Sequence, residues 1–363
     1  MKVLSKIIRE KRCSIFKASI ILILSLLLYI NSYENAFVVS ADDMAPLSLW
    51  TDSARAKNEL ISYVSDVTNP ESKNYIPLQD RIAVFDLDGT LFCETDPVYF
   101  DHQLLEYRVL EDSSYKDKAS DAEKAAANKS LEFANTGVYP QGLDVEHGQA
   151  VASAFRGMTI DEFTDYIAKF RDTPANGYNN MTKGDAFYQP MIQVINYLHQ
   201  NGFMVYIVSG TDRFIVRGLV KGKLPILPCR IIGSDESLVS NHQENTDSLD
   251  YMYKKNDMVV LGGNFIIKNL KMNKVNVIVQ EIGQQPVLAF GNSSGDFSMA
   301  EYVTSHNAHK SLAFMLCCDD TERENGKISS AEKMYQSCKE NNWIPISMKN
   351  DWTTIYGEGV SKK

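Results

Sequence analysis

Three short apolar runs, each followed at once by small polar residues, constrain the fold of this chain most. They are Ile82–Phe85, Phe203–Val208 and Pro286–Phe290. Uninterrupted apolar runs of this length are typical of strands that are buried on both faces. Apolar residues at helical spacing precede the second and third runs, over 191–198 and 275–282. The pattern predicts an α/β fold, a doubly wound parallel sheet with helices on both faces.

Polar residues follow each of these runs at the point where the predicted strand ends. Asp86-Leu-Asp-Gly-Thr90 follows the first, Ser209-Gly-Thr-Asp212 the second and Gly291-Asn-Ser-Ser-Gly-Asp296 the third. Each has a simpler interpretation, since Asp and Ser side chains often bond to nearby backbone N–H groups in turns or helix caps. The carboxyl ends of parallel strands, however, share one edge of the sheet, where ligands bind. Together with Lys274, at the start of the helix before the third run, they predict a phosphate and metal site.

In this order the four motifs resemble the haloacid dehalogenase superfamily, specifically its phosphoserine phosphatase-like branch with a helical cap inserted after the first motif. The resemblance covers about residues 80–316. It implies that Asp86 attacks phosphorus and forms an aspartyl-phosphate, and that Asp88 protonates the leaving alcohol and then activates water. It also implies that Ser209, the Gly210 N–H and Lys274 hold the phosphoryl oxygens.

The resemblance further implies a Mg²⁺ cofactor, held by Asp86, Asp88, Asn292 and Asp296. The family's fourth motif usually opens with Asp where this chain has Asn292. An amide oxygen can ligate Mg²⁺ but brings no charge, so metal affinity should fall unless Asp296 contributes directly. A weakened, non-catalytic phosphate-binding member of the fold therefore remains an alternative.

Two other lysines compete with Lys274 for its position. Lys271 lies three residues earlier, and Lys268 lies in the segment 258–269, which reads as a β-hairpin with its turn at Gly262-Gly263. Lys274 is favoured because a helical pattern follows it directly.

Helical patterns without a buried strand fill residues 97–188, which we expect to form the cap. Their helices are expected at 99–111, 121–133 and 144–155, and a fourth begins at the capping box Thr159-Ile-Asp-Glu162. The α/β core is then 42–96 and 189–363, with a lead-in helix near 54–64 and a further strand at 312–316.

The cap suggests a small phosphomonoester as substrate, because a lid of this size would exclude bulk water. Acidic and aromatic residues near the first motif and in the cap could line the pocket, among them Glu94, Tyr99 and Tyr139. Such a lining would suit a phosphocholine-type cationic headgroup, which is an alternative substrate. His102, His147 and His199 show no metal-ligand spacing, so solvated or capping roles are expected.

The first 41 residues read as a signal peptide. A basic leader precedes the uncharged run 18–30, whose thirteen residues would rise about 20 Å as a helix, short of a ~30 Å hydrocarbon core. A small-residue cleavage site, Val39-Ser-Ala41, follows. An uncleaved membrane anchor is the alternative, and it would make the membrane a partner. Both place the protein outside the cytoplasm.

Charge argues against nucleic acid as a partner. Removal of residues 1–41 takes away six basic and two acidic side chains and moves the formal net charge from −9 to −13. Such a surface repels phosphate backbones.

Overall fold

The computed structural model describes residues 46–363 of the chain. The expected leader, 1–41, lies outside these residues, so the predicted signal peptide or anchor stays a prediction. Among residues 46–363, no helix combines the length and hydropathy needed to cross a bilayer.

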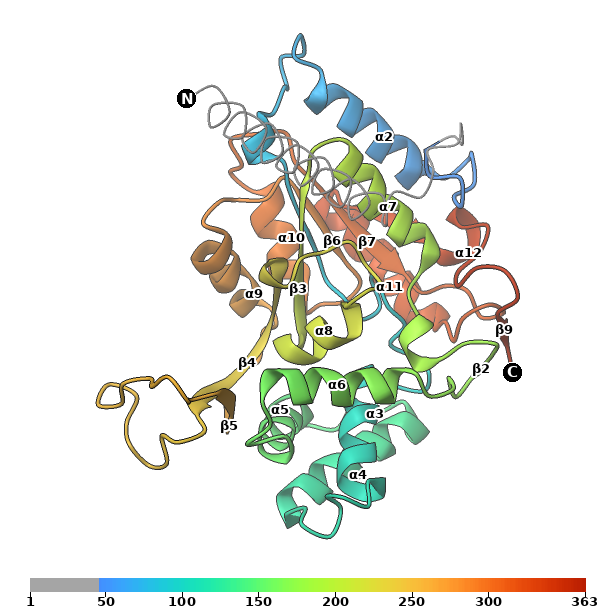
Figure 1. Cartoon of the computed structure of the whole chain (residues 1–363). Helices are drawn as coiled ribbons and strands as arrows, with labels where there is room; N and C mark the ends of the chain where they lie inside the picture. The colour runs from blue at the N-terminus through green and yellow to red at the C-terminus, as the bar shows by residue number, and fades with distance from the viewer. Residues whose placement is uncertain (1–45) are drawn as a thin grey trace, which may run out of the picture. The chain divides into compact units, whose positions relative to one another are not determined.

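A seven-stranded, mostly parallel sheet forms the centre of the described chain (Figure 1). The strand order is β5-β4-β3-β1-β6-β7-β8, and all neighbours run parallel except β4 and β5. The strands are β1 (Ile82–Phe85), β3 (Met204–Asp212), β4 (Ile231–Ser240), β5 (Val259–Ile267), β6 (Leu288–Gly291), β7 (Leu312–Cys317) and β8 (Ile344–Ser347). The three apolar runs became adjacent strands, with β1 between β3 and β6, and the predicted fold class is confirmed.

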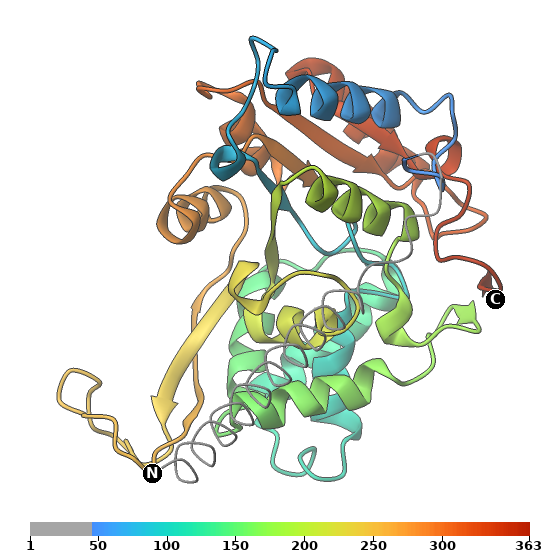
Figure 2. The same ribbon diagram turned by 45° about the horizontal axis from the view of Figure 1, so that its top comes forward.

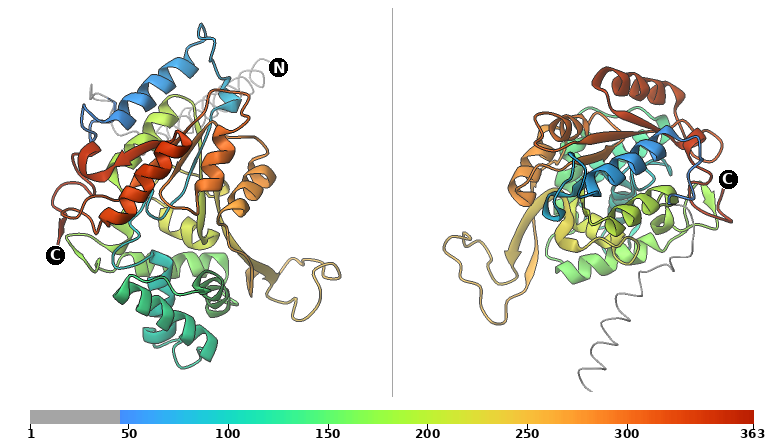
Figure 3. Two further views of the ribbon diagram at one scale, coloured as in Figure 1. Left: turned by 180° about the vertical axis from the view of Figure 1, so that it is seen from behind. Right: turned by 90° about the horizontal axis from the view of Figure 1, so that it is seen from above.

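Helices cover both faces of this sheet. On one face lie α2 (Arg55–Thr68), α7 (Gln189–Gln200) and α8 (Arg213–Val220), and on the other α9 (Met272–Val277), α10 (Phe297–Thr304) and α11 (Ile328–Asn341). The right view of Figure 3 shows α11 and α2 on opposite sides of the strands. The short helix α12 (Met348–Asp351) follows β8. The expected lead-in helix is α2, whose apolar face packs on the sheet.

Alternate residues of the central strands feed the two apolar cores. Phe85 packs in one core with its ring stacked on Phe290, at 4.1 Å between centroids, while Val84 belongs to the other. Because the side chains of β1 are buried on both faces, the strand is fixed in register, with Phe85 opposite Ile207 and Phe290. The first and fourth motifs therefore begin next to each other, and the second motif forms the last four residues of β3 beside them.

Four helices between β1 and α7 make up the cap. They are α3 (Phe100–Glu106), which continues as a π-helical turn at Tyr107–Glu111, α4 (Asp121–Thr136), α5 (Leu143–Ala154) and α6 (Ile160–Arg171). Thr159 and Glu162 form the expected capping box at the start of α6. Figures 1 and 2 show these helices beyond the carboxyl ends of the central strands. The helices expected at 99–111, 121–133 and 144–155 are thus confirmed within a few residues.

The β-hairpin predicted at 258–269 is wrong. Residues 259–267 form one continuous strand, β5, which pairs antiparallel with β4. Gly262 and Gly263 make no turn, but they let neighbouring groups approach closely. A Cβ at Gly262 would lie 2.4 Å from the Ser237 hydroxyl oxygen, and one at Gly263 would lie 2.7 Å from Arg156 Cδ. The glycine pair serves close packing across the strand, which its sequence cannot distinguish from a turn.

Candidate active site

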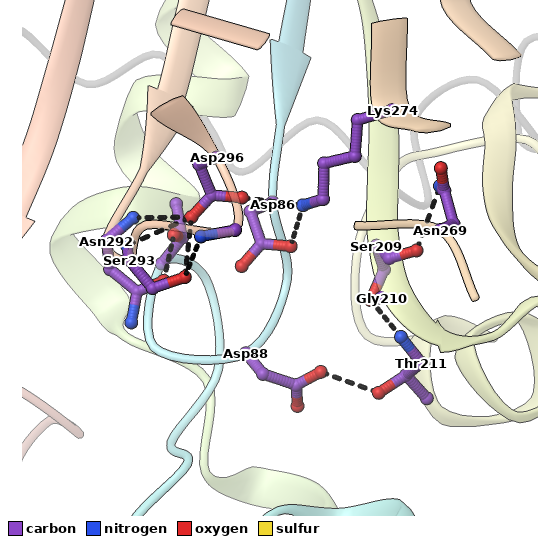
Figure 4. A network of polar contacts seen from close by, with 12 residues as sticks. Asp86, Asp88, Ser209, Gly210, Thr211, Asn269, Lys274, Asn292, Ser293 and Asp296 are labelled. Carbon is purple, nitrogen blue, oxygen red and sulfur yellow. Dashed lines mark hydrogen bonds and ion pairs between the residues drawn. The ribbon is translucent and has the colours of Figure 1, made fainter. Parts of the chain in front are cut away.

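The polar residues after β1, in the last four positions of β3 and after β6 meet at the carboxyl edge of the sheet (Figure 4). Strand β3 continues through Ser209-Gly-Thr-Asp212, beyond its predicted end at Val208. Asp86 follows β1 directly, and its backbone N–H donates to the Phe290 carbonyl of β6 at 2.9 Å. Asp86 and Asp88 are 6% and 9% exposed. Charged groups this deeply buried require partners, and each carboxylate has one.

A tight turn brings the first motif against the fourth. The N–H groups of Thr90, Leu91 and Phe92 all point to the Leu87 carbonyl. Gly89 within this turn has φ +73°, and a Cβ there would lie 1.8 Å from Asn292 Nδ2. Only glycine fits both this backbone conformation and the contact.

Lys274 links the first and fourth motifs. Its ammonium donates to Asp86 Oδ1 at 2.5 Å and to Asp296 Oδ1 at 2.6 Å, and the side chain is fully buried. Of the other two candidate lysines, Lys271 is exposed and Lys268 lies further along the pocket wall. The structure thus places Lys274, as expected, beside the proposed nucleophile.

Asp296 holds Lys274 and the loop of the fourth motif. Its Oδ2 accepts the backbone N–H groups of Asn292 and Ser293, each at 3.0 Å, while Oδ1 accepts from Lys274. Both oxygens therefore have protein partners. Direct metal ligation by Asp296, which the sequence predicts, would require one of these contacts to be exchanged.

Thr211 is a site residue that the sequence reasoning missed. Its hydroxyl donates to Asp88 Oδ2 at 2.8 Å, and its N–H donates to Ser209 Oγ at 3.0 Å. Thr211 and Gly210 line the cavity, whereas Ser209 is fully buried and is not part of its lining. The sequence signal that could have identified Thr211 is its own hydroxyl, two residues after Ser209 in the same motif.

Asn292 stands between the turn of the first motif and Glu94. Its Nδ2 donates to Glu94 Oε1 at 2.9 Å, and its Oδ1 accepts from the Thr90 hydroxyl at 3.4 Å. Glu94, expected only as a pocket residue, thus supplies a carboxylate next to the amide that replaces the usual Asp.

Burial and crowding of carboxylates shift the acid–base properties of the site. Burial raises the pKa of Asp86 to about 7, and Asp296 adds to this shift while Lys274 opposes it. Burial, followed by repulsion from Asp101 and Asp86, raises the pKa of Asp88 well above its usual range. Both effects favour the acid form of the Asp88 carboxyl.

The same crowding affects the neighbouring groups. Burial raises the pKa of Glu94 to about 7, with Asp86 adding to the shift. Burial disfavours the charge on Lys274, but Asp296 and Asp86 outweigh it and raise the pKa of its ammonium. One buried ammonium faces several carboxylates, and a bound divalent cation would relieve their repulsion.

A cavity of about 90 Å³ opens between this sheet edge and the cap. We call it the catalytic cavity. Its core wall includes Asp86, Asp88, Gly210, Thr211, Lys268 and Lys274, and its cap wall includes Tyr99, Asp101, His102, Tyr139 and Asp144. A second cavity of about 350 Å³ adjoins it and shares Glu94 and Tyr99. The catalytic cavity has room for a phosphoryl group and a small leaving group.

The expectation for two histidines is wrong. His102 and His147 are not solvated but 3% and 1% exposed, and their rings stack at 4.0 Å between centroids. Helices α3 and α5 pack against each other in the cap and bring these residues together.

Comparison with known proteins finds solved structures with a similar fold. A solved structure of a conserved protein of unknown function from Anaerococcus prevotii DSM 20548 is similar, with 14% identity over 84% of this chain and 94% of that chain and a TM-score of 0.50. A phosphoserine phosphohydrolase-like protein from Francisella tularensis subsp. tularensis SCHU S4 has 11% identity over 70% of this chain and 92% of its own, with a TM-score of 0.38.

A probable phosphoserine phosphatase from Vibrio cholerae has 12% identity over 73% of this chain and 69% of its own, with a TM-score of 0.36. No curated protein matches the chain in sequence. The family model of haloacid dehalogenase-like hydrolases matches residues 83–301, which include all four motifs and the cap. The chain therefore belongs to the haloacid dehalogenase-like hydrolase family.

Proposed function

We propose that this hydrolase is a Mg²⁺-dependent phosphatase that cleaves small phosphomonoesters through an aspartyl-phosphate on Asp86. The observation that carries the proposal is the pairing of Asp86 with the buried Lys274 in a cavity where burial and neighbouring carboxylates favour the acid form of Asp88. Phosphoryl transfer requires an in-line nucleophile, neutralised charge and an acid for the leaving group. This chain places one residue for each requirement.

Asp86 is suited to nucleophilic attack. Lys274 fixes one carboxylate oxygen at 2.5 Å and favours the ionised form of Asp86 against the burial that raises its pKa to about 7. The Lys274 ammonium then faces the phosphoryl oxygens on which charge develops, and the Gly210 N–H is the second group proposed for this role. Ser209 stays a candidate phosphate ligand only if its buried hydroxyl becomes accessible.

Asp88 is suited to acid–base catalysis. Thr211 orients its carboxyl through the 2.8 Å hydrogen bond. In the first step the protonated carboxyl donates to the departing alkoxide. The resulting carboxylate then removes a proton from the water that attacks the acyl-phosphate.

The oxygen-rich side chains of the site fit Mg²⁺. Asp86, the Asp88 backbone carbonyl and Asn292 Oδ1 would hold the ion, and Glu94 supplies nearby negative charge. When bound, Mg²⁺ would offset the repulsion between Asp86 and the phosphate and polarise the transferred group.

A cationic headgroup is a second candidate for the leaving group, as in phosphocholine. Tyr99, Tyr139 and the carboxylates of Glu94 and Asp144 line the catalytic cavity. Aromatic faces and carboxylates together attract quaternary ammonium groups. Nucleic acid is not an expected partner, and the N-terminal leader favours a secreted or otherwise extracytoplasmic enzyme.

The test is metal-dependent turnover. The protein should release phosphate from p-nitrophenyl phosphate with Mg²⁺ and lose this activity in EDTA. Asp86→Asn should abolish it, and Asp117→Asn, on an exposed residue of the cap, should not. Borohydride reduction of the trapped acyl-phosphate should convert Asp86 to homoserine, which mass spectrometry detects. Phosphate binding without turnover across a panel of phosphomonoesters, phosphocholine included, would favour the non-catalytic alternative.

A further inference from the structure

A buried cluster of two imidazoles and a carboxylate lies in the cap beside the catalytic cavity. Asp101 and His102 belong to α3, and His147 belongs to α5. They are 3%, 3% and 1% exposed. The catalytic mechanism uses none of these side chains. Burying three polar groups at one place is costly unless each finds a partner.

Within residues 46–363, each of the three has a buried polar atom that makes no hydrogen bond. These atoms are Asp101 Oδ1, His102 Nδ1 and His147 Nε2. The contact between His147 Nδ1 and Asp101 Oδ2 is 3.8 Å long, too long for a hydrogen bond. Within the described part of the chain, the cluster therefore has potential metal-ligand atoms that form no hydrogen bond with another protein group.

The geometry of the cluster fits a single metal ion. One potential ligand atom from each residue can be chosen so that all three lie within 4.8 Å of one another. Around tetrahedral Zn²⁺, with bonds of about 2.0–2.1 Å, ligand atoms lie roughly 3.3 Å apart. A modest contraction of the three side chains would reach that spacing. A small cavity of about 10 Å³ adjoins Asp101 and His147, and the catalytic cavity adjoins Asp101 and His102.

The chemistry of the cluster and its surroundings also suits a cation. Imidazole nitrogens and carboxylate oxygens are ligands of divalent transition metals. Acidic residues outnumber lysines in the walls of the two cavities, and Lys268 lines both. Lys268 is the cation that a metal would have to tolerate or displace.

We propose that Asp101, His102 and His147 form a binding site for Zn²⁺ or a similar divalent transition metal. Two imidazole ligands select such metals over Mg²⁺, which prefers oxygen. The ion would tie α3 to α5 and so stiffen the cap wall of the catalytic cavity. Its fourth position would hold water. The site is separate from the Mg²⁺ site proposed at Asp86, and neither depends on the other.

Cobalt substitution tests the proposal. The purified protein is stripped with EDTA, returned to excess Mg²⁺ to fill the catalytic site, and titrated with Co²⁺. We expect visible absorption bands of a low-coordinate site that saturate at about one equivalent, and Zn²⁺ should displace them. His102→Ala and His147→Ala should abolish the bands. His199→Ala, in α7 of the core, and Asp86→Asn should leave them unchanged.

Lys268→Met tests the proposal without changing a histidine, so it stays informative if the histidine variants do not fold. Removal of the neighbouring positive charge should tighten Co²⁺ binding roughly tenfold. Zn²⁺ should also raise the melting temperature of the wild type and of Asp86→Asn, but not of the histidine variants. Absence of Co²⁺ bands in the folded wild type, or bands that persist in both histidine variants, would overturn the proposal. So would unchanged affinity in Lys268→Met.

Discussion

Replacement of Lys274 by Met should destabilise the protein strongly at neutral pH. The substitution keeps the length of the side chain but removes an ammonium that lies 2.5 Å from Asp86 and 2.6 Å from Asp296. Two buried carboxylates would then face each other without a cation, and at least one must take up a proton. Burial already raises the Asp86 pKa to about 7 in the wild type, so part of the cost of protonation is present before the substitution. Removal of one partner from a buried ion pair typically costs ~3–5 kcal/mol.

The loss of stability in Lys274→Met should depend on pH. In Lys274→Met the folded state raises the pKa of a carboxyl above its unfolded value, so it binds more protons than the unfolded state. Stability of the variant should therefore fall as pH rises above ~4. The wild type shares this fall up to its own Asp86 pKa of about 7. The gap in stability between wild type and variant should therefore be smaller at pH 5 than at pH 7, and should widen as pH rises above 7.

Urea denaturation in EDTA, followed by circular dichroism at pH 5 and pH 7, measures both free energies of unfolding. Lys271→Met, three residues earlier and exposed, is the matched control and should change stability by less than about 0.5 kcal/mol. Lys274→Met/Asp296→Asn should recover part of the loss, because only one carboxylate is then left buried. A loss below about 1 kcal/mol, or one that is equal at both pH values, would refute the reasoning.

Three further predictions address the turn, the acid and the cap. Gly89→Ala should cost about 1–2 kcal/mol through its positive φ, and should weaken Mg²⁺ activation of turnover because its Cβ displaces Asn292. Asp88→Asn should slow the hydrolysis of an alkyl phosphate more than that of p-nitrophenyl phosphate, whose leaving group needs no acid. The wild-type hydrolysis rate should fall at alkaline pH as Asp88 loses its proton. Burial raises the pKa of Glu106 from 4.5 to about 8, so stability should fall across that window as pH rises, and Glu106→Gln should flatten the dependence in urea titrations.

The central fold could be predicted because its signals are local. Strands β1, β3 and β6 are buried on both faces, so each leaves an uninterrupted apolar run in the sequence. Strand β4 leaves no such signal, since its second half leaves the parallel sheet to pair with β5 and carries polar residues such as Asp235 and Glu236. Strand β8 is only four residues long. Both were missed.

The site could be predicted only as far as topology fixes it. Asp86 and Lys274 are 188 positions apart, yet the order of the parallel strands was enough to bring their motifs to one edge. His102 and His147 lie on two helices whose relative rotation no spacing rule gives, so their contact in the cap could not be foreseen. Thr211 was missed for a similar reason. Whether the hydroxyl of Ser209 or that of Thr211 faces the cavity depends on the local path of the backbone at the end of β3.

Asn292 departs from the family's fourth motif, and its contact with Glu94 gives this departure a physical reason. In sequence, an amide at this position removes one negative charge from the expected metal site. In the structure, the Asn292 amide donates to Glu94 at 2.9 Å, so a carboxylate from the first motif's own loop stands where charge was missing. An Asp at position 292 would instead meet Glu94 as a second anion, in a pocket where burial and Asp86 already raise the Glu94 pKa to about 7. Asn292 therefore allows the Glu94 carboxylate to lie next to it. An amide at position 292 is compatible with the proposed magnesium site.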